Sequence, residues 1–353
     1  MLINRFVEKT IEIKGSDLFL RVNSVPMARV CGDIVRLSDE IVNSDLMERM
    51  IRDFVKDDEI MIMEQNHGYE GAAWFKDNWR IRIGIFYQRG TPSMVIRIID
   101  LRISGFEELR LPSEALKNLC AQRRGLVLLT GTTGSGKSTT IASMIEYINQ
   151  TQKKHILSIE EPVEFTFKDK NSIINQREIG KDVKDYAIAL RQFALHSPDV
   201  IFIGNIRDEE TMSAALTAAE TGVLVFSTLH TVNAPQTIER ILSFFPPYQQ
   251  DQISMQLSQL LKGVVSLRLI PKKDKTGLVA CSEVMVLSPT VSRLIRERKI
   301  NEIPRYIEEG EIYGMTSFEQ SLLKLVKGSV IDAQTALSFS DKKEELQMRI
   351  QNT

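Results

Sequence analysis

The residues from Gly131 to Ser138 (GTTGSGKS) carry the chemistry that is most direct to infer. Glycines in such a run let backbone N–H groups converge on phosphate oxygens, which Cβ atoms would obstruct. Lys137 is then expected to reach the β- and γ-phosphates of ATP, and the Ser138 hydroxyl to ligate Mg²⁺. A chance glycine-rich turn is the alternative. It is disfavoured because an apolar run (126–130) precedes the segment and a helical pattern follows it, as a P-loop requires.

The nucleotide-binding residues are expected in this loop and in the first turn of the helix after it, whose N-terminal dipole favours phosphate. They are Thr133, Gly134, Ser135, Gly136, Lys137, Ser138 and Thr139.

Three carboxylates follow a second apolar run, residues 155–159, at Glu160, Glu161 and Glu164. In sheets of this kind such a strand is expected next to the P-loop. The carboxylates could hold Mg²⁺ through water and deprotonate the attacking water. A solvated acidic turn is the alternative interpretation.

Two further apolar runs end in polar residues that should lie at the same rim. The run 200–203 is followed by Asn205, where P-loop enzymes usually place an acidic residue on the metal side. The predicted metal-side residues are therefore Ser138, Glu160, Glu161 and Asn205. The run 223–226 leads to His230, which taken alone is more often a structural histidine than a functional one.

The elements that must position these residues alternate between strands and helices. Helical stretches near 183–195 and 208–220 separate the apolar runs. This order predicts an α/β fold with a parallel sheet, helices on both faces, and ligands at the carboxyl ends of the strands. From about residue 247 the chain is predicted to be mostly helical.

The residues before about 100 have a different pattern, typical of a small α+β domain. Residues 79–85 alternate, with isoleucines on one face and Arg80 and Arg82 on the other. Residues 93–99 follow a Gly-Thr-Pro turn signal at 90–92, so the two runs are predicted to pair as a hairpin.

Composition limits the class of protein. At 353 residues, two domains are expected, and 43% hydrophobic with 26% charged residues is ordinary for a soluble protein. A net charge of −1 gives no long-range attraction to nucleic acid. Three distant cysteines suggest neither a disulfide framework nor a zinc site. No signal peptide or apolar run long enough to span a membrane is present, so a cytoplasmic protein is expected.

Taken together, these segments resemble the secretion ATPase superfamily and, within it, the type IV pilus retraction ATPase family (PilT/PilU). The resemblance runs over nearly the whole chain, through motifs in the family's order. The matching segments are 15–20, 131–139, 159–165, 175–178, 218–222, 228–231, 294–297 and 314–318.

The resemblance implies a PAS-like N-terminal domain at residues 1–105. It implies a RecA-like ATPase domain at 106–353, with a helical portion from about 285. It further implies a homohexameric motor, cytoplasmic and peripheral at the inner face of the membrane, that docks on an inner-membrane pilus platform protein. ATP hydrolysis with Mg²⁺ would power pilus retraction and twitching motility.

Roles for particular residues also come from the resemblance. Glu164 becomes the catalytic glutamate, and His230 a γ-phosphate sensor or coupling residue. Arg82 and Arg97 become candidates for stabilising phosphate charge, with a solvated sheet face as the alternative. The chain lacks the tetracysteine zinc motif of assembly and export ATPases, which favours the retraction branch.

The sequence departs from the family pattern at three positions near the site. Asn205 stands where the Walker B glutamate is usual, Leu195 where an arginine is usual, and Glu161 where an aspartate is usual. Asn205 keeps an oxygen but loses the charge that helps hold hydrated Mg²⁺. ATP is therefore expected to bind, with slower hydrolysis. The alternatives are an accessory PilU-like ring subunit supporting a paralogous retraction ATPase, and an assembly or type II secretion ATPase.

Overall fold

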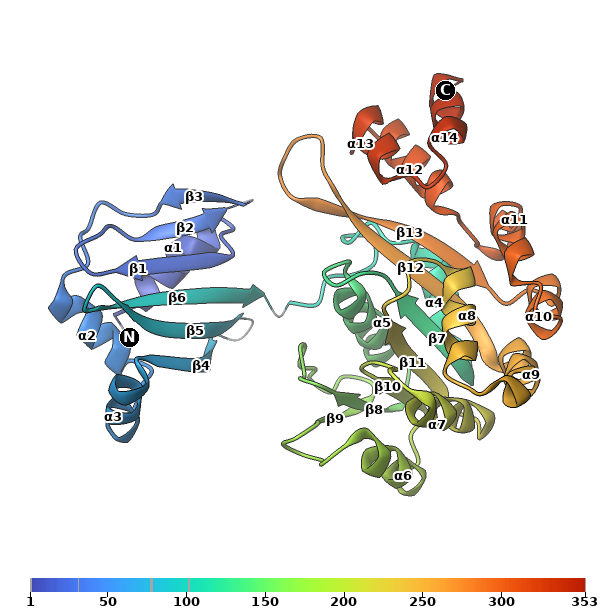
Figure 1. Cartoon of the computed structure of the whole chain (residues 1–353), viewed down its shortest axis with the longest axis horizontal. Coiled ribbons are helices and arrows are strands. Elements are labelled where there is room, and N and C mark those ends of the chain that lie inside the picture. The colour runs from blue at the N-terminus through green and yellow to red at the C-terminus, as the bar shows by residue number, and fades with distance from the viewer. Residues whose placement is uncertain (1, 31, 77–78, 101, 353) are drawn as a thin grey trace. The chain divides into compact units, whose positions relative to one another are not determined.

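The computed structural model describes residues 2–30, 32–76, 79–100 and 102–352. The chain forms two compact units, Met1–Arg102 and Ile103–Thr353, here called unit 1 and unit 2 (Figure 1).

Over its described residues, unit 1 is a six-stranded antiparallel sheet in the order β3-β2-β1-β6-β5-β4, with three helices. Its strands are β1 (Asp17–Arg21), β2 (Met27–Val30), β3 (Asp33–Arg36), β4 (Gly68–Phe75), β5 (Trp79–Gln88) and β6 (Thr91–Asp100). Its helices are α1 (Asn4–Glu12), α2 (Ser44–Arg52) and α3 (Asp57–Asn66). The predicted hairpin is confirmed as β5 and β6. Ile81, Ile83 and Ile85 are buried, whereas Arg82 on the other face is exposed.

Unit 2 is built on a seven-stranded sheet in the order β13-β12-β7-β11-β10-β8-β9 (Figure 1). All neighbouring strands are parallel except β12 and β13. Its strands are β7 (Gly125–Thr130), β8 (His155–Glu160), β9 (Ile173–Glu178), β10 (Val200–Ile203), β11 (Leu224–Leu229), β12 (Leu261–Pro271) and β13 (Leu278–Val286). Its first helices are α4 (Ser113–Cys120), α5 (Lys137–Thr151), α6 (Tyr186–His196), α7 (Glu209–Glu220), α8 (Ala234–Ser243), α9 (Gln250–Leu260), α10 (Pro289–Arg296) and α11 (Ile303–Glu308).

Helices cover both faces of this sheet, which explains the continuous apolar runs of its central strands. Alternate residues of β7 belong to the cores on opposite faces of the sheet. Val127 and Leu129 pack with α4 and α5, and Leu126 and Leu128 belong to the core shared with α6 to α11. The α/β class predicted from the sequence is confirmed.

One expectation about unit 2 was wrong. The strand ending at Glu160 is not beside the P-loop strand, since β11 and β10 lie between β7 and β8. Helices make up most of the elements beyond residue 247, as expected, but β12 and β13 form a long antiparallel pair there that was not predicted.

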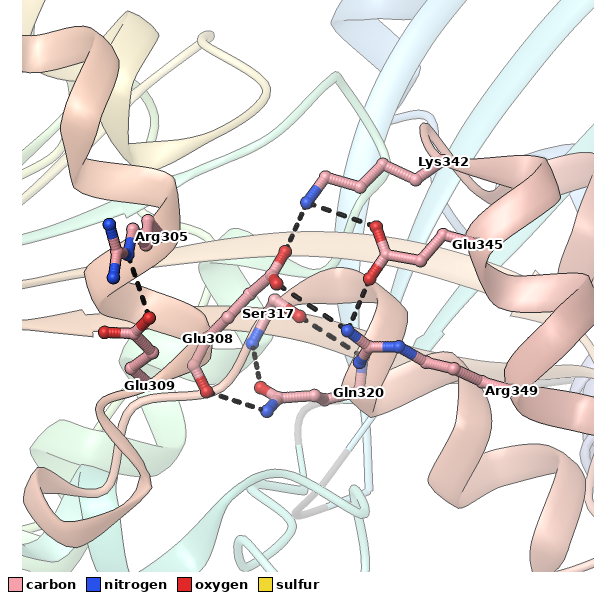
Figure 2. Close-up of polar contacts among 8 residues, drawn as sticks. All are labelled: Arg305, Glu308, Glu309, Ser317, Gln320, Lys342, Glu345 and Arg349. Atoms are coloured by element: carbon pink, nitrogen blue, oxygen red, sulfur yellow. Dashed lines mark hydrogen bonds and ion pairs between the residues drawn. The ribbon is translucent and has the colours of Figure 1, made fainter. Parts of the chain in front are cut away.

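The C-terminal helices α12 (Phe318–Lys327), α13 (Ala333–Phe339) and α14 (Lys343–Gln351) pack on the β12–β13 pair. Figure 2 shows the charged contacts that attach α14 to α11. Glu308 pairs with Lys342, and lies 3.7 Å from Arg349, which also pairs with Glu345 (Figure 2). Within the described ranges, we find no helix with the length and apolar character that a membrane crossing demands.

Candidate nucleotide site

The loop between β7 and α5 has the geometry that its glycines predict. Gly136 precedes α5 in the left-handed region, with φ of 95°. Gly131 has φ of 141°, and a Cβ there would lie 2.4 Å from Ser135 Oγ and 2.5 Å from the Leu267 carbonyl oxygen. The path of the loop therefore depends on glycine at position 131.

Lys137, the first residue of α5, folds back over this loop. Its Nζ donates to the carbonyl oxygens of Gly131 and Thr132, at 2.7 and 2.9 Å. Burial lowers the pKa of Lys137, and the negative charge of Glu164 opposes that shift. The ammonium is thus held at the mouth of the loop, where it can transfer its hydrogen bonds from carbonyl oxygens to phosphate oxygens.

The predicted metal-side and acidic residues come together despite the unexpected strand order. Parallel strands bring the ends of β7, β8, β10 and β11 to one edge of the sheet. A cavity of about 70 Å³ at this edge is lined by Ser138, Glu160, Glu161, Glu164 and Asn205, among others.

The acidic residues differ in their environments. Glu160 is buried, and its Oε1 accepts from Ser158 Oγ at 2.7 Å and from Gln176 Nε2 at 3.2 Å. Burial raises the pKa of Glu160, against these two hydrogen bonds. Glu161 is half-exposed and pairs with Arg207 at 3.0 Å. Glu164 is exposed at the rim, which leaves it accessible to a water molecule.

Asn205 lines the same cavity, and its Oδ1 is buried. Among the residues that the structure describes, no group donates a hydrogen bond to this oxygen. A buried, unsatisfied amide oxygen costs about 1–3 kcal/mol. The Ser138 hydroxyl lines the same cavity. These are hard oxygen donors of the kind that Mg²⁺ prefers, so the residues present fit a magnesium ion bound with nucleotide phosphates.

Across the described ranges, no group of three or more His, Cys, Asp or Glu side chains is arranged to hold a metal ion.

His230 follows β11 at the same edge of the sheet and is exposed. Partial desolvation lowers the pKa of His230, and so do the positive charges of Lys137 and Arg207. The neutral imidazole is favoured, which can either donate or accept a hydrogen bond.

Arg82 and Arg97 lie in unit 1, directly opposite each other on β5 and β6. Both are exposed on the face away from the core. Arg97 Nε donates to Asp17 Oδ1 at 2.9 Å, and Asp17 is buried. This pair gives Arg97 a structural contact within the sheet, so the role predicted for the two arginines stays a prediction.

The structure adds residues that sequence reasoning had not selected. Tyr186 and Thr228 line the cavity, and Arg207 pairs with Glu161. Thr228 Oγ1 donates to the Gly204 carbonyl at 2.7 Å, which fixes the turn that carries Asn205. Burial, with the charge of Glu161, raises the pKa of Tyr186 to about 12. Of these three residues, Arg207 alone had a signal in the sequence, because it ends the segment Gly204–Arg207 that follows a buried strand.

Known proteins match the chain over most of its length. A family model described as "Type II/IV secretion system protein" matches residues 74–330. The "Twitching motility protein" of Neisseria gonorrhoeae is 39% identical over 321 residues, 91% of this chain and 86% of that protein. The type IV pilus ATPase PilU of Pseudomonas aeruginosa is 35% identical over 350 residues, 99% of this chain and 91% of PilU. A crystal structure of the pilus retraction motor PilT with bound ADP covers 98% of this chain and 99% of its own, with a TM-score of 0.83 and 39% identity.

Proposed function

The chain belongs to the type II/IV secretion system protein family and is an ATPase of RecA-like fold, and we propose that it powers the retraction of a type IV pilus. One observation supports this proposal above the others. The chain shares almost its entire length and fold with a retraction motor that binds ADP, and its own P-loop and acidic cavity lie at one edge of the sheet.

Each side chain has a proposed role in hydrolysis. Lys137 binds the β- and γ-phosphates, and the P-loop amides hold the rest of the triphosphate. Ser138 and Asn205 hold Mg²⁺, which would neutralise part of the phosphate charge. Glu164 accepts a proton from the attacking water. Glu160 and Glu161 would help to hold Mg²⁺ through water, and neutral His230 contacts the γ-phosphate. Arg82 and Arg97 remain candidates for stabilising phosphate charge.

The assembly is also part of the proposal. We infer that residues 1–105 act as a PAS-like domain and 106–353 as the ATPase domain of a homohexameric ring. The ring would work in the cytoplasm against an inner-membrane pilus platform protein.

An ATPase assay with matched lysine variants tests the enzymatic part. Lys137→Ala should abolish hydrolysis by the purified protein, because the ammonium at the mouth of the loop is lost. Lys153→Ala removes an exposed lysine just after α5 and should leave the rate unchanged. Equal activity in the native chain and Lys137→Ala would refute the proposal. Deletion of the protein should produce excess pili, whereas an assembly or type II secretion role predicts pilus loss or normal pili.

A second candidate is an accessory ring subunit that binds nucleotide and supports a paralogous retraction ATPase. It is favoured by Asn205, whose amide leaves the metal side one carboxylate short, and by the similarity to PilU over 99% of the chain. Cells carrying Lys137→Ala would then retract normally, while cells lacking the protein would not. A defect in both strains would contradict this candidate.

A further inference from the structure

A line of buried polar groups connects the P-loop strand to the start of α8. Thr130 Oγ1 donates to Ser266 Oγ at 3.0 Å, and Ser266 Oγ donates to Glu283 Oε1 at 3.3 Å. The backbone N–H of Ala234 donates to the same Oε1 at 2.8 Å. These groups come from β7, β12, β13 and α8, so four elements meet at one carboxylate.

Glu283 is held in an apolar interior. Its exposed fraction is 8%, and those of Thr130, Ser266 and Ala234 are 0%. A carboxylate in such a place costs free energy unless its hydrogen bonds are made, and two donors converge on it here. Ala234 is the first residue of α8, so the positive end of that helix also faces the carboxylate.

The charged groups near Glu283 come from two other elements. Arg268 of β12 favours the ionised carboxylate, and Glu319 of α12 disfavours it. The guanidinium of Arg268 also bonds the Phe339 carbonyl at 2.8 Å and Asp341 at 2.5 Å. Burial has the largest effect and raises the pKa of Glu283 to about 7.

The two ends of this line lie at parts of the nucleotide site. Thr130 directly precedes Gly131, the first residue of the P-loop. Ala234 directly follows the short loop 230–233, which begins at His230. We propose that Glu283 is a positioning residue of the ATPase, which fixes the loop carrying His230 relative to the P-loop strand. This inference rests on the proposed ATPase function.

The ionised carboxylate is the stronger acceptor for both donors, since charge-assisted hydrogen bonds are about twice as strong as neutral ones. Protonation of Glu283 weakens its hold on the Ala234 amide and therefore on the loop before it. The turnover number should rise with pH as this carboxylate ionises. The KM for ATP should change little, because the phosphate cradle itself is unaltered.

The first test is steady-state ATP hydrolysis, measured from acidic to alkaline pH across neutrality. Glu283→Gln keeps the size and one acceptor oxygen but not the charge. We expect kcat to fall roughly tenfold at high pH, with the pH-dependent rise near neutrality lost. Glu283→Asp should retain a pH-dependent rise. Glu319→Gln removes a nearby buried carboxylate that disfavours ionisation of Glu283, so the pH-dependent rise should remain but move to lower pH. An unchanged kcat and pH profile in Glu283→Gln would overturn the proposal.

Amide hydrogen exchange provides a test that does not depend on hydrolysis. In the nucleotide-free native protein, the protection of residues 230–236 should be greater above neutral pH than below it, after correction for intrinsic exchange. Glu283→Gln should remove this difference, and Ser266→Ala should loosen the P-loop strand end while keeping the Ala234 contact. If neither the native chain nor Lys137→Ala hydrolyses ATP, only the proposed ATPase function is refuted. Unchanged exchange at 230–236 in Glu283→Gln would refute the positioning role.

Discussion

Replacing Glu283 by glutamine should change how the stability of unit 2 depends on pH. Glutamine has nearly the same shape and can accept the Ala234 N–H, but it does not ionise. The native carboxylate is buried, so it enters the folded interior more favourably as the neutral acid than as the anion. The variant therefore removes a cost that the native protein bears only at higher pH.

The size of this effect follows from the two ionisations. Burial raises the pKa of Glu283 from 4.5 to about 7 on folding. With a raised pKa, the contribution to stability is full below the unfolded pKa and is lost as pH rises through the folded one. The loss is roughly 1 kcal/mol at about pH 5.5 and roughly 3 kcal/mol at about pH 8. Between these conditions, the variant should gain about 2 kcal/mol of unfolding free energy relative to the native chain.

Denaturant titrations of both proteins at the two pH values measure this gain, and any constant cost of the substitution cancels in the comparison. Both tryptophans, Trp74 and Trp79, lie in unit 1, so their fluorescence does not report the unfolding of unit 2. Unfolding of unit 2 should therefore be followed by pulse proteolysis. Tryptophan fluorescence of unit 1 then serves as an internal control that should not change. The reasoning is refuted if the difference between variant and native chain is the same at both pH values.

The other predictions concern the cradle, the metal side and the C-terminal helix. Gly131→Ala should abolish binding of a fluorescent ADP analogue, since its Cβ would lie 2.4 Å from Ser135 Oγ; undiminished affinity would contradict this. Asn205→Glu restores a carboxylate on the metal side and should speed ATP hydrolysis roughly tenfold, about 1.4 kcal/mol in the barrier; equal rates would show that the amide is irrelevant. Glu308→Gln should cost under about 1 kcal/mol and increase hydrogen exchange in residues 343–351 at low salt only. An equal increase at high salt would exclude an ionic cause.

The sequence allowed good prediction of the parts of the fold that depend on local pattern. The P-loop, the hairpin of unit 1 and the central strands of unit 2 each have a short, distinctive signal. The β12–β13 pair was missed because its apolar runs alone do not separate a buried strand from a buried helix. The position of β8 in the sheet was also misjudged. Crossover connections insert strands from later in the chain between two strands that are consecutive in sequence, as β11 and β10 lie between β7 and β8.

The same limit applies to the candidate site. Lys137, Ser138 and Glu164 belong to recognisable motifs, so their positions could be expected. Glu283 belongs to none of the recognised motifs, and its two hydrogen-bond donors come from segments 17 and 49 residues earlier in the chain. A signal was nevertheless present, because a single charged residue within the apolar run 278–286 needs a partner or a function.

The attachment of α14 affects how the protein behaves in solution. Leu346 of that helix is buried in the apolar cluster with α12 and α13, and the charged pairs around Glu308 connect it to α11 (Figure 2). Attraction between exposed charges shortens in range from about 10 Å at 0.1 M salt to about 3 Å at 1 M. Because these pairs supply under about 1 kcal/mol while Leu346 stays buried, added salt should only loosen the helix, and the apolar surface beneath it, around Phe318 and Leu322, should be uncovered somewhat more often. The protein should then self-associate more as salt is added, and a preparation kept in dilute buffer should stay the most monodisperse.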